Sequence, residues 1–231
     1  MSTFGDIKLS AEDWAFTDKI LSSDALAAQL ITRVKDRVPT SVIRMSDGER
    51  AVIKHAKDGS LAGFLKDPVW LKRFGLEGAD IRKVGEELLL AGNNADYLAC
   101  TVSGLYLPQY RVHNLFPDHR QFIDSFYPRM WWATYRVGDV LKAGQVLILH
   151  RNQAALVPKL AERYGLKGVE GMTLDSWRDQ EGLLERVREH PASTVLVSGG
   201  PSGKPFCVKL ARVAGKVVLD VGEAMTNCWT A

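Results

Sequence analysis

The feature of this chain that most constrains its fold is a regular alternation of short apolar segments with helical segments after residue 145. The apolar segments, typical of buried strands, occupy 145–150, the vicinity of 167–171, 194–198 and 216–221. The helical segments between them occupy 153–164, about 176–189 and 200–214. Strands that alternate with helices of about 10–15 residues are typical of parallel βαβ units. The pattern therefore predicts an open, doubly wound, mostly parallel sheet of the α/β class.

The first part of the chain continues this pattern up to a loop-rich middle. Helices are predicted within 11–37, from 47 to about 57 and from about 79 to 91, strands over 40–45 and 97–102, and an irregular segment over 58–77. Residues 103–135 are rich in aromatic side chains, namely Tyr106, Tyr110, Phe116, Phe122, Phe126, Tyr127, Trp131, Trp132 and Tyr135. Aromatic residues mostly bury, which favours a helical insertion packed on the sheet. A surface that faces an acceptor is the alternative.

The length of the chain fits one domain. Its 231 residues, 46% of them hydrophobic, suffice for one sizeable core and are too few for two large ones. No repeat, low-complexity segment or linker-like tract divides the sequence. We therefore expect a single Rossmann-like domain over 1–231, with N-terminal helices over 1–37, a core over 38–231 and a helical, aromatic-rich middle insertion.

Charge and cysteine content exclude several classes of protein. The formal net charge is only +3, and lysine and arginine alternate with acids instead of forming the basic stripe of a nucleic-acid-binding protein. Cys100, Cys207 and Cys228 are odd in number and widely spaced, so neither a disulfide framework nor a zinc site is predicted. The N-terminus does not resemble a signal peptide, and no apolar run reaches the ~18 residues of a membrane span. We expect a cytoplasmic protein without a transmembrane segment.

The first motif with chemical potential follows the strand predicted over 40–45. Ligands of open α/β sheets bind outside the carboxyl ends of the strands, and there the sequence has Asp47 and Glu49 on either side of Gly48. Such a pair can hold a hard cation, Mn²⁺ or Mg²⁺, whose shell is completed by phosphate oxygens, and Arg44 can meet the same phosphates. The alternative is a helix cap, with Asp47 as the N-cap and Glu49 in the first turn. Spacing alone does not separate the two.

The second motif follows the strand over 194–198 and opens a helix. It consists of Gly199, Gly200, Pro201, Ser202, Gly203 and Lys204. Free backbone N–H groups at a helix start can bind an anion. The spacing matches neither a Walker A loop nor the G-x-G-x-x-G pattern of dinucleotide-binding proteins. The alternative is a tight βα turn with Pro201 near the first helical position.

Further candidates lie at other strand exits. Asp220 and Glu223 follow the last predicted strand, while His150 and Asp175 follow two others. Acids at these positions would face the same ligand, although each alone is more often a cap or an ion-pair partner. His150 could contact a nucleotide or serve only the local structure.

In series, these motifs resemble the GT-D-type glycosyltransferases. The pattern of that family is Ser-x-Ile-Arg-aromatic-Gly-Asp-Gly-Glu, then Gly-Pro-small-small, then Asp-Ile-Gly-His. The chain has Ser41-Val42-Ile43-Arg44-Met45-Ser46-Asp47-Gly48-Glu49, Gly200-Pro201-Ser202-Gly203 and Asp220-Val221-Gly222-Glu223 in the same order. The resemblance spans about residues 38–225. It departs from the pattern where Met45-Ser46 replaces the aromatic-glycine pair and Glu223 replaces the histidine.

The resemblance implies an inverting, metal-dependent glycosyltransferase. Its sugar would come from a UDP-sugar, and its acceptor would be a hydroxyl of a glycan, glycolipid or glycoprotein, as in polysaccharide biosynthesis. The family pattern assigns the divalent cation to Asp47 and Glu49. Arg44, the turn over 199–204 with Lys204, and His150 would contact the donor, and Glu223 or Asp220 would be the general base. A non-catalytic nucleotide-sugar-binding scaffold and a nucleotide-sugar hydrolase are the alternatives. The sequence does not decide whether the protein is a homo-oligomer.

Overall fold

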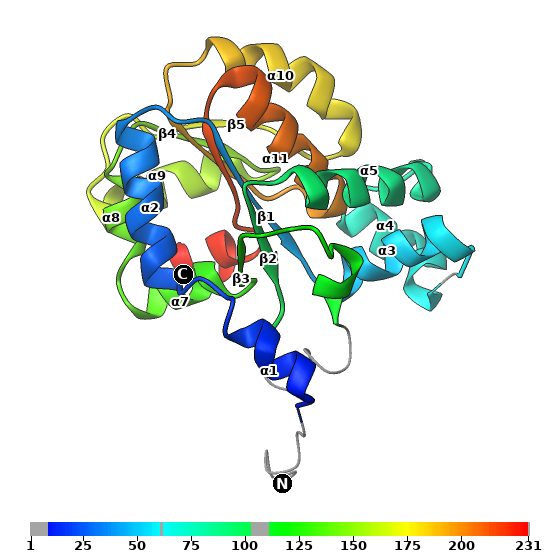
Figure 1. The fold of residues 1–231 in the computed structure, drawn as a ribbon. Helices are drawn as coiled ribbons and strands as arrows, with labels where there is room; N and C mark the ends of the chain where they lie inside the picture. The colour runs from blue at the N-terminus through cyan, green and yellow to red at the C-terminus, as the bar shows by residue number, and fades with distance from the viewer. Residues whose placement is uncertain (1–8, 61, 103–110, 231) are drawn as a thin grey trace, which may run out of the picture.

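The fold is built on one parallel sheet. The computed structural model describes residues 9–60, 62–102 and 111–230, and in this part seven strands pair in the order β3-β2-β1-β7-β6-β4-β5 (Figure 1). The strands are β1 (Thr40–Met45), β2 (Tyr97–Cys100), β3 (Phe122–Asp124), β4 (Val146–Leu149), β5 (Glu170–Met172), β6 (Thr194–Val197) and β7 (Val217–Asp220). All pairings are parallel. The predicted open α/β sheet is confirmed.

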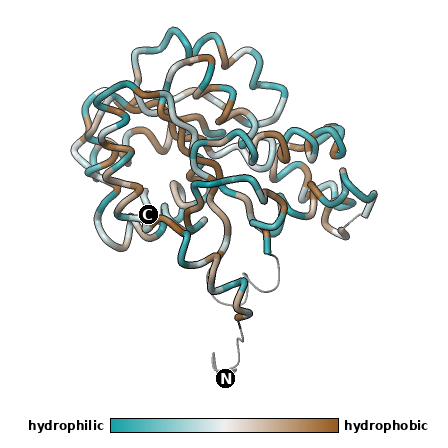
Figure 2. The backbone as a smooth tube through the Cα atoms, in the orientation of Figure 1, coloured by the Kyte–Doolittle hydropathy of each residue, from teal (hydrophilic) through white to brown (hydrophobic). Residues whose placement is uncertain are grey.

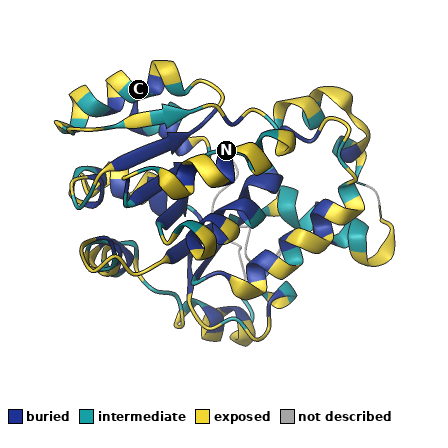
Figure 3. Ribbon diagram, turned by 90° about the horizontal axis from the view of Figure 1, so that it is seen from above, coloured by how far each residue is buried: buried dark blue, intermediate teal, exposed yellow. Residues whose placement is uncertain are grey.

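Both faces of the sheet are buried, as parallel sheets require. In β4, Leu147 and Leu149 belong to one hydrophobic core, whereas Val146 and Ile148 belong to a second core on the opposite face. This alternation follows from the two-residue period of a strand. The strands form the apolar centre of the backbone trace (Figure 2), and seen from above they are dark, buried bands between helices with exposed outer faces (Figure 3).

The helices divide between the two cores. The first core packs against α3 (Asp47–Asp58), α5 (Ile81–Asn94), α10 (Gln180–Glu189) and α11 (Gly200–Ala214), with α4 (Pro68–Arg73) at its edge. The second core packs against α2 (Ser23–Lys35), α7 (Tyr127–Ala133), α8 (Val137–Leu141) and α9 (Gln153–Tyr164). A further short helix, α1 (Ala11–Thr17), precedes α2. No helix of the described part is both long and apolar enough to cross a bilayer.

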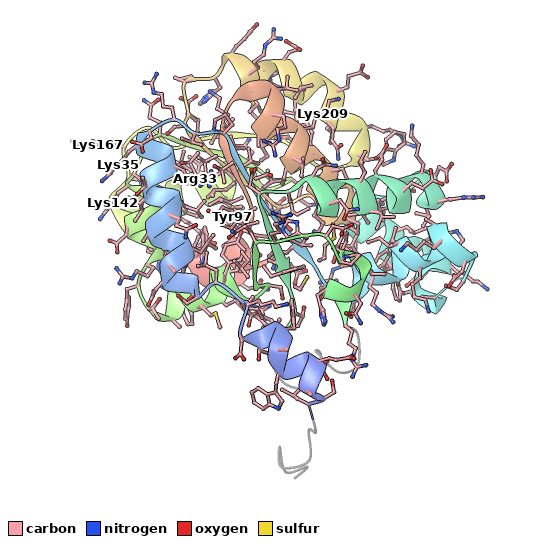
Figure 4. The ribbon with its side chains drawn as sticks, viewed as in Figure 1. Arg33, Lys35, Tyr97, Lys142, Lys167 and Lys209 are labelled. Atoms are coloured by element: carbon pink, nitrogen blue, oxygen red, sulfur yellow. The ribbon has the colours of Figure 1, made fainter. Side chains whose placement is uncertain are left out.

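Helix α2 is fixed to the sheet by a mixed apolar and polar contact. Leu26 and Leu30 are fully buried in the second core. On the same helix, Gln29 accepts a hydrogen bond from the Tyr97 hydroxyl of β2, and the Arg33 guanidinium lies 5.5 Å from the centre of the Tyr97 ring (Figure 4). A cation over an aromatic face adds to the burial of the ring.

Three segments differ from the prediction. Residues 122–124 form β3, which was not predicted, and α4 lies in the stretch that was expected to be irregular. The strand expected at 167–171 lies at 170–172. Within the aromatic middle, Phe116, Phe122, Tyr127 and Trp131 are buried, as the insertion hypothesis required, whereas Trp132 and Tyr135 are exposed. Tyr106 and Tyr110 lie outside the described residues.

Helices α3 and α5 approach each other closely through a glycine. A Cβ at Gly85 would lie 2.5 Å from the backbone oxygen of Val52 and 2.7 Å from the Cβ of Ala56. We therefore expect Gly85→Ala to lower the free energy of unfolding by ~1–3 kcal/mol, the usual cost of overpacking, measured by urea denaturation. Gly182→Ala in α10 is the matched control, because nothing lies within 4 Å of its Cβ position. The control should gain ~0.5–1 kcal/mol, and equal stability of the two variants would contradict the prediction.

Candidate active site

The adjacent strands β1 and β7 mark the place in the sheet where a ligand is expected. After β1 the chain enters α3, in the first core, whereas after β7 it enters a π-helical turn, η5 (Met225–Trp229), in the second core. Neighbouring parallel strands whose connections leave to opposite faces form the topological switch point of an open α/β sheet, where ligands bind. The first and third sequence motifs lie at this point, and the second follows β6, the other neighbour of β7.

Lys204 joins the three motifs in one buried charge cluster. Its Nζ lies 3.1 Å from Oε1 of Glu49 and 3.2 Å from Oδ2 of Asp220, and it donates to the backbone oxygen of Gly200 at 3.1 Å. Only 5% of the side chain is exposed. An ammonium group has three protons, and each has an acceptor within the protein. Lys204 was expected to contact a phosphate, but in this arrangement it neutralises two carboxylates of the protein.

Arg44 supplies the second positive charge of the cluster. Its Nε lies 3.5 Å from Oδ2 of Asp220, and its backbone N–H donates to the same oxygen at 3.2 Å. Gly222 has φ +50°, and a Cβ there would overlap the Arg44 guanidinium, so a glycine makes room for it. The Arg44 side chain is 24% exposed, and its two Nη atoms have no partner among the described residues. Arg44 therefore retains donors for an anion.

The charges of the cluster hold one another ionised. Burial alone would raise the pKa of Asp220, but the charges of Lys204 and Arg44 hold it below the ordinary 3.8. Burial alone would lower the pKa of Lys204, but Asp220 and Glu49 hold it above the ordinary 10.5. Opposite charges at contact distance favour the charged form of each partner. Asp220 is consequently a fixed anion and poorly suited to accept a proton.

The predicted metal pair is placed in the first turn of α3, and its two acids differ in surroundings. Ser46, and not Asp47, is the N-cap residue of this helix. Both oxygens of Glu49 have partners, because Oε2 accepts from the Ser46 backbone N–H at 3.0 Å and Oε1 contacts Lys204. Asp47 is exposed, and its Oδ1 accepts from the Ser46 hydroxyl at 3.0 Å. Glu49 is thus half of a capping box, and Asp47 is open to solvent.

These surroundings are compatible with a cation that takes few protein ligands. The described residues contain no group of three or more histidine, cysteine, aspartate or glutamate side chains that could hold a metal ion. Mg²⁺ commonly uses one or two carboxylates and completes its shell with water and substrate phosphates. The exposed carboxylate of Asp47 fits this type of site, with Glu49 as a fixed second acid whose oxygens each keep a lone pair.

The turn over 199–204 is more enclosed than expected. Pro201, Ser202, Gly203 and Lys204 are buried, while Gly199 and Gly200 are half-buried. Gly200 has φ +60°, and a Cβ there would overlap the backbone oxygen of Phe74. The amide of Gln180 donates to the backbone oxygen of Ser202 at 3.0 Å. The protein itself therefore makes the contacts around this turn. This arrangement is the one expected of a tight βα turn, the alternative to an anion site.

The segment that covers the turn continues from α4. Arg73 pairs with Glu223 after β7 at 2.9 Å. A Cβ at Gly75 would lie 2.8 Å from the backbone oxygen of Asp175, which follows β5. Arg151, which follows β4, donates to the backbone oxygen of Arg73 at 3.0 Å. Residues 73–75 therefore lie across the carboxyl ends of four strands, a placement that no pattern in the irregular stretch predicted.

The remaining candidates make no direct contact with the four side chains of the charge cluster. Nδ1 of His150 accepts from the backbone N–H of Asn152 at 2.8 Å, and burial lowers its pKa, so the ring is a neutral local cap. Asp175 pairs with Arg151 at 3.1 Å. Glu223 is 53% exposed, with Arg73 as its partner. The structure thus brings together Arg44, Glu49, Lys204 and Asp220, and leaves His150, Asp175 and Glu223 in separate contacts.

One acid and a row of hydroxyls were missed because β3 was not predicted. Asp124 ends β3, and burial raises its pKa above the ordinary 3.8. The next hydroxyl, of Ser125, lies 2.9 Å from that of Thr101, which lies 3.2 Å from that of Ser46. These side chains line the ends of three neighbouring strands. An Asp-Ser pair directly after the apolar pair Phe122-Ile123 is the signal that could have identified them.

Comparisons with known proteins agree with this fold. A model of the family described as GT-D fold-like domain matches residues 21–228. A solved structure, reported to show that the domain of unknown function 1792 has a distinct glycosyltransferase fold, superposes with a TM-score of 0.62 at 13% identity, covering 91% of this chain and 81% of that chain. At that identity the likeness concerns the fold. No curated protein matches. The family expected from the three motifs is confirmed.

Proposed function

Because the chain belongs to the GT-D fold-like domain family, we propose that it is a glycosyltransferase that moves a sugar from a UDP-sugar to a hydroxyl of a glycan or glycoconjugate, with inversion. The observation that supports this most directly is the Arg44 guanidinium at the switch point. Its Nε forms an ion pair with Asp220, and its Nη donors have no partner among the described residues. A planar guanidinium with spare donors suits the oxygens of a diphosphate.

The negative charge of a donor diphosphate needs more than one cation. A bound Mn²⁺ or Mg²⁺ would supply Lewis-acid stabilisation of the leaving phosphate. Asp47 would hold it from the start of α3, with Glu49 as the second acid, because both follow β1 on the same turn. Arg44 would contact the diphosphate from the end of β1. The positive end of the α3 dipole lies at the same place and also favours binding of the negatively charged diphosphate.

The chemical step is a single displacement at C1 of the donor sugar. A carboxylate takes the proton of the acceptor hydroxyl as its oxygen forms a bond to C1. The bond from C1 to the phosphate oxygen breaks, and the nucleoside diphosphate leaves with the electron pair. Attack opposite to the leaving group inverts the configuration at C1. Lys204 and Arg44 hold the pKa of Asp220 below its ordinary value, which makes Asp220 a weak base. We therefore assign this role to one of two other carboxylates, Glu223 or Asp124.

Asp47→Asn should abolish most of the metal-dependent gain in UDP affinity. The neutral amide loses the charge that attracts the cation, and we expect a drop of about tenfold or more in affinity with Mn²⁺ present, measured by calorimetry. Asp118→Asn, an exposed aspartate in a turn, is the control. Equal UDP affinity of Asp47→Asn and wild type, with and without Mn²⁺, would show that Asp47 does not bind the cation and serves only the start of α3.

The two alternatives differ from the proposal in their products. With a UDP-sugar and candidate acceptors, a transferase releases UDP and extends the acceptor. A hydrolase releases free sugar without acceptor, and a binding scaffold releases neither. Mass spectrometry of nucleotides retained by the purified protein would identify the donor first. Donor binding without turnover on any acceptor would contradict the proposed activity.

A further inference from the structure

A hollow lies away from the proposed donor site, at the ends of three elements of the second core. It has a volume of about 850 Å³ and is lined by the end of α7, by α8 and by the end of α9. Its main side chains are Trp132, Tyr135, Asp139, Lys142, Arg163 and Tyr164. Helix α9 starts just after the carboxyl end of β4 and is ~18 Å long from its 12 residues. Its end, and with it the hollow, is therefore distant from the switch point.

The hollow is lined by two aromatic rings that are exposed to solvent and not packed in a hydrophobic core. Trp132 is 43% exposed and Tyr135 is 89% exposed, although the neighbouring Tyr127 and Trp131 are completely buried. The third ring, of Tyr164, lies in the wall, with Arg163 6.0 Å from its centre. A ring with an apolar face and a polar edge suits a ligand that has both kinds of surface. A pyranose is such a ligand, because it has an apolar C–H face and polar hydroxyl groups at its edge.

The backbone at Tyr135 indicates that the exposed ring is not there for stability. Tyr135 has φ +59°. Its N–H donates to the backbone oxygen of Trp132 at 3.3 Å, and the next N–H, of Arg136, donates to that of Trp131 at 2.8 Å. This is a Schellman ending of α7, with Tyr135 at the position that glycine usually takes. A glycine would relieve the left-handed conformation at almost no loss of packing, so the tyrosine at this position carries a cost to the stability of the fold.

The charges of the hollow favour an anionic ligand. Lys142, which is labelled in Figure 4, makes no ion pair or hydrogen bond through its ammonium among the described residues, and Arg163 adds a second positive charge to the lining. The acid of the lining, Asp139, is paired with Arg136 at 3.3 Å. An adjoining shallow hollow adds one lysine, Lys159, and one acid, Glu162, so the positive charge is confined to Lys142 and Arg163. A carboxylate or phosphate on the ligand would complement this side of the hollow.

We propose that this hollow is a second carbohydrate-binding site, which holds an acidic segment of the acceptor glycan by stacking on Trp132 and Tyr135 and by an ion pair with Lys142. Its assignment to the acceptor rests on the proposed glycosyltransferase function, whereas the binding of an acidic glycan does not. The concave shape favours a chain of sugars over a membrane surface, which would need a convex or flat patch. Distance from the donor site means that the hollow would hold a part of the acceptor remote from the reacting hydroxyl.

The test uses purified full-length protein and two probes, hexagalacturonate and the uncharged maltohexaose, with binding measured by calorimetry. Tyr135→Gly should weaken hexagalacturonate binding about threefold to tenfold while raising Tm by about 2–4 °C. Tyr135→Phe, which keeps the ring, should bind like wild type. Lys142→Gln should weaken binding of hexagalacturonate and leave that of maltohexaose unchanged.

Two further measurements separate the possible failures. UDP affinity should be the same in all these variants, so loss of the proposed activity and loss of the glycan site are distinguishable. Absence of binding to both oligosaccharides, or binding that Tyr135→Gly leaves unchanged, would overturn the proposal. Cosedimentation with phosphatidylserine vesicles that depends on Tyr135, without oligosaccharide binding, would overturn it in favour of a membrane surface.

Discussion

Lys204→Met is expected to lower the free energy of unfolding by ~3–5 kcal/mol, the cost of removing one partner from a buried ion-pair network. The variant leaves the carboxylates of Glu49 and Asp220 with the half-buried Arg44 as their remaining cation, and it leaves the backbone oxygen of Gly200 without its donor. Urea denaturation would measure the loss. Lys209→Met is the matched control, because Lys209 is an exposed lysine of the same helix (Figure 4) and should change stability by less than ~0.5 kcal/mol.

A double variant distinguishes charge imbalance from lost packing. Lys204→Met combined with Glu49→Gln removes one positive and one negative charge and leaves Arg44 paired with Asp220. If uncompensated charge causes the loss, the double variant should be more stable than Lys204→Met alone, a coupling that a double-mutant cycle measures. A double variant that loses the sum of both single effects would show that the network contributes no specific pairing.

The same network predicts a pH dependence. The pKa of Asp220 is lower in the folded protein than its ordinary value of 3.8. The unfolded chain therefore binds the proton first as pH falls, and the stabilisation is present above 3.8 and is lost as pH falls through the folded value. The stability difference between wild type and Lys204→Met should thus stay constant down to about pH 4 and shrink below it. A difference that is unchanged in strong acid would argue against a paired Asp220.

Most of the sheet could be predicted because strands buried on both faces have a strong signal. The strands over 146–149, 194–197 and 217–220 consist almost entirely of apolar residues, as strands of a parallel sheet usually do, and the strand over 40–45 has Val42 and Ile43 at its centre. In contrast, β3 has three residues, of which the last is Asp124, and so shows no period. Helix α4 had the signals of a helix start, with Asp67 as the N-cap and Pro68 at the first position. Its six residues were too few for an apolar period.

The site was predictable in its members but not in its contacts. The rule that ligands bind at strand exits placed Arg44, Glu49, Lys204 and Asp220 at one edge of the sheet, where they are in contact. That the Lys204 charge is neutralised internally depends on distances between elements far apart in the sequence. The contact of Phe74 with Gly200 likewise comes from a segment without a recognisable pattern.

Glu223→Gln is expected to lower the rate of sugar transfer by ~10²–10⁴, the usual contribution of a general base, while leaving UDP and metal affinity unchanged. Glu223 follows β7, beside the switch point, and is exposed enough to meet an acceptor hydroxyl. Its partner Arg73 is still more exposed, so the pair can open at little cost. Arg73→Gln, which frees the carboxylate without removing it, should retain most of the activity and is the matched control.

Two outcomes would assign the base to another residue. If Glu223→Gln retains full transfer and Asp124→Asn loses it, the base is Asp124. Burial raises the pKa of Asp124 above 3.8, so the acidic limb of the rate profile, where activity falls as the base is protonated, would then lie above the ordinary range of an aspartate. Asp220→Asn cannot be interpreted by rate alone, because it leaves Lys204 with one carboxylate fewer and should lower stability first. Full transfer in both Glu223→Gln and Asp124→Asn would exclude each of these carboxylates as the base.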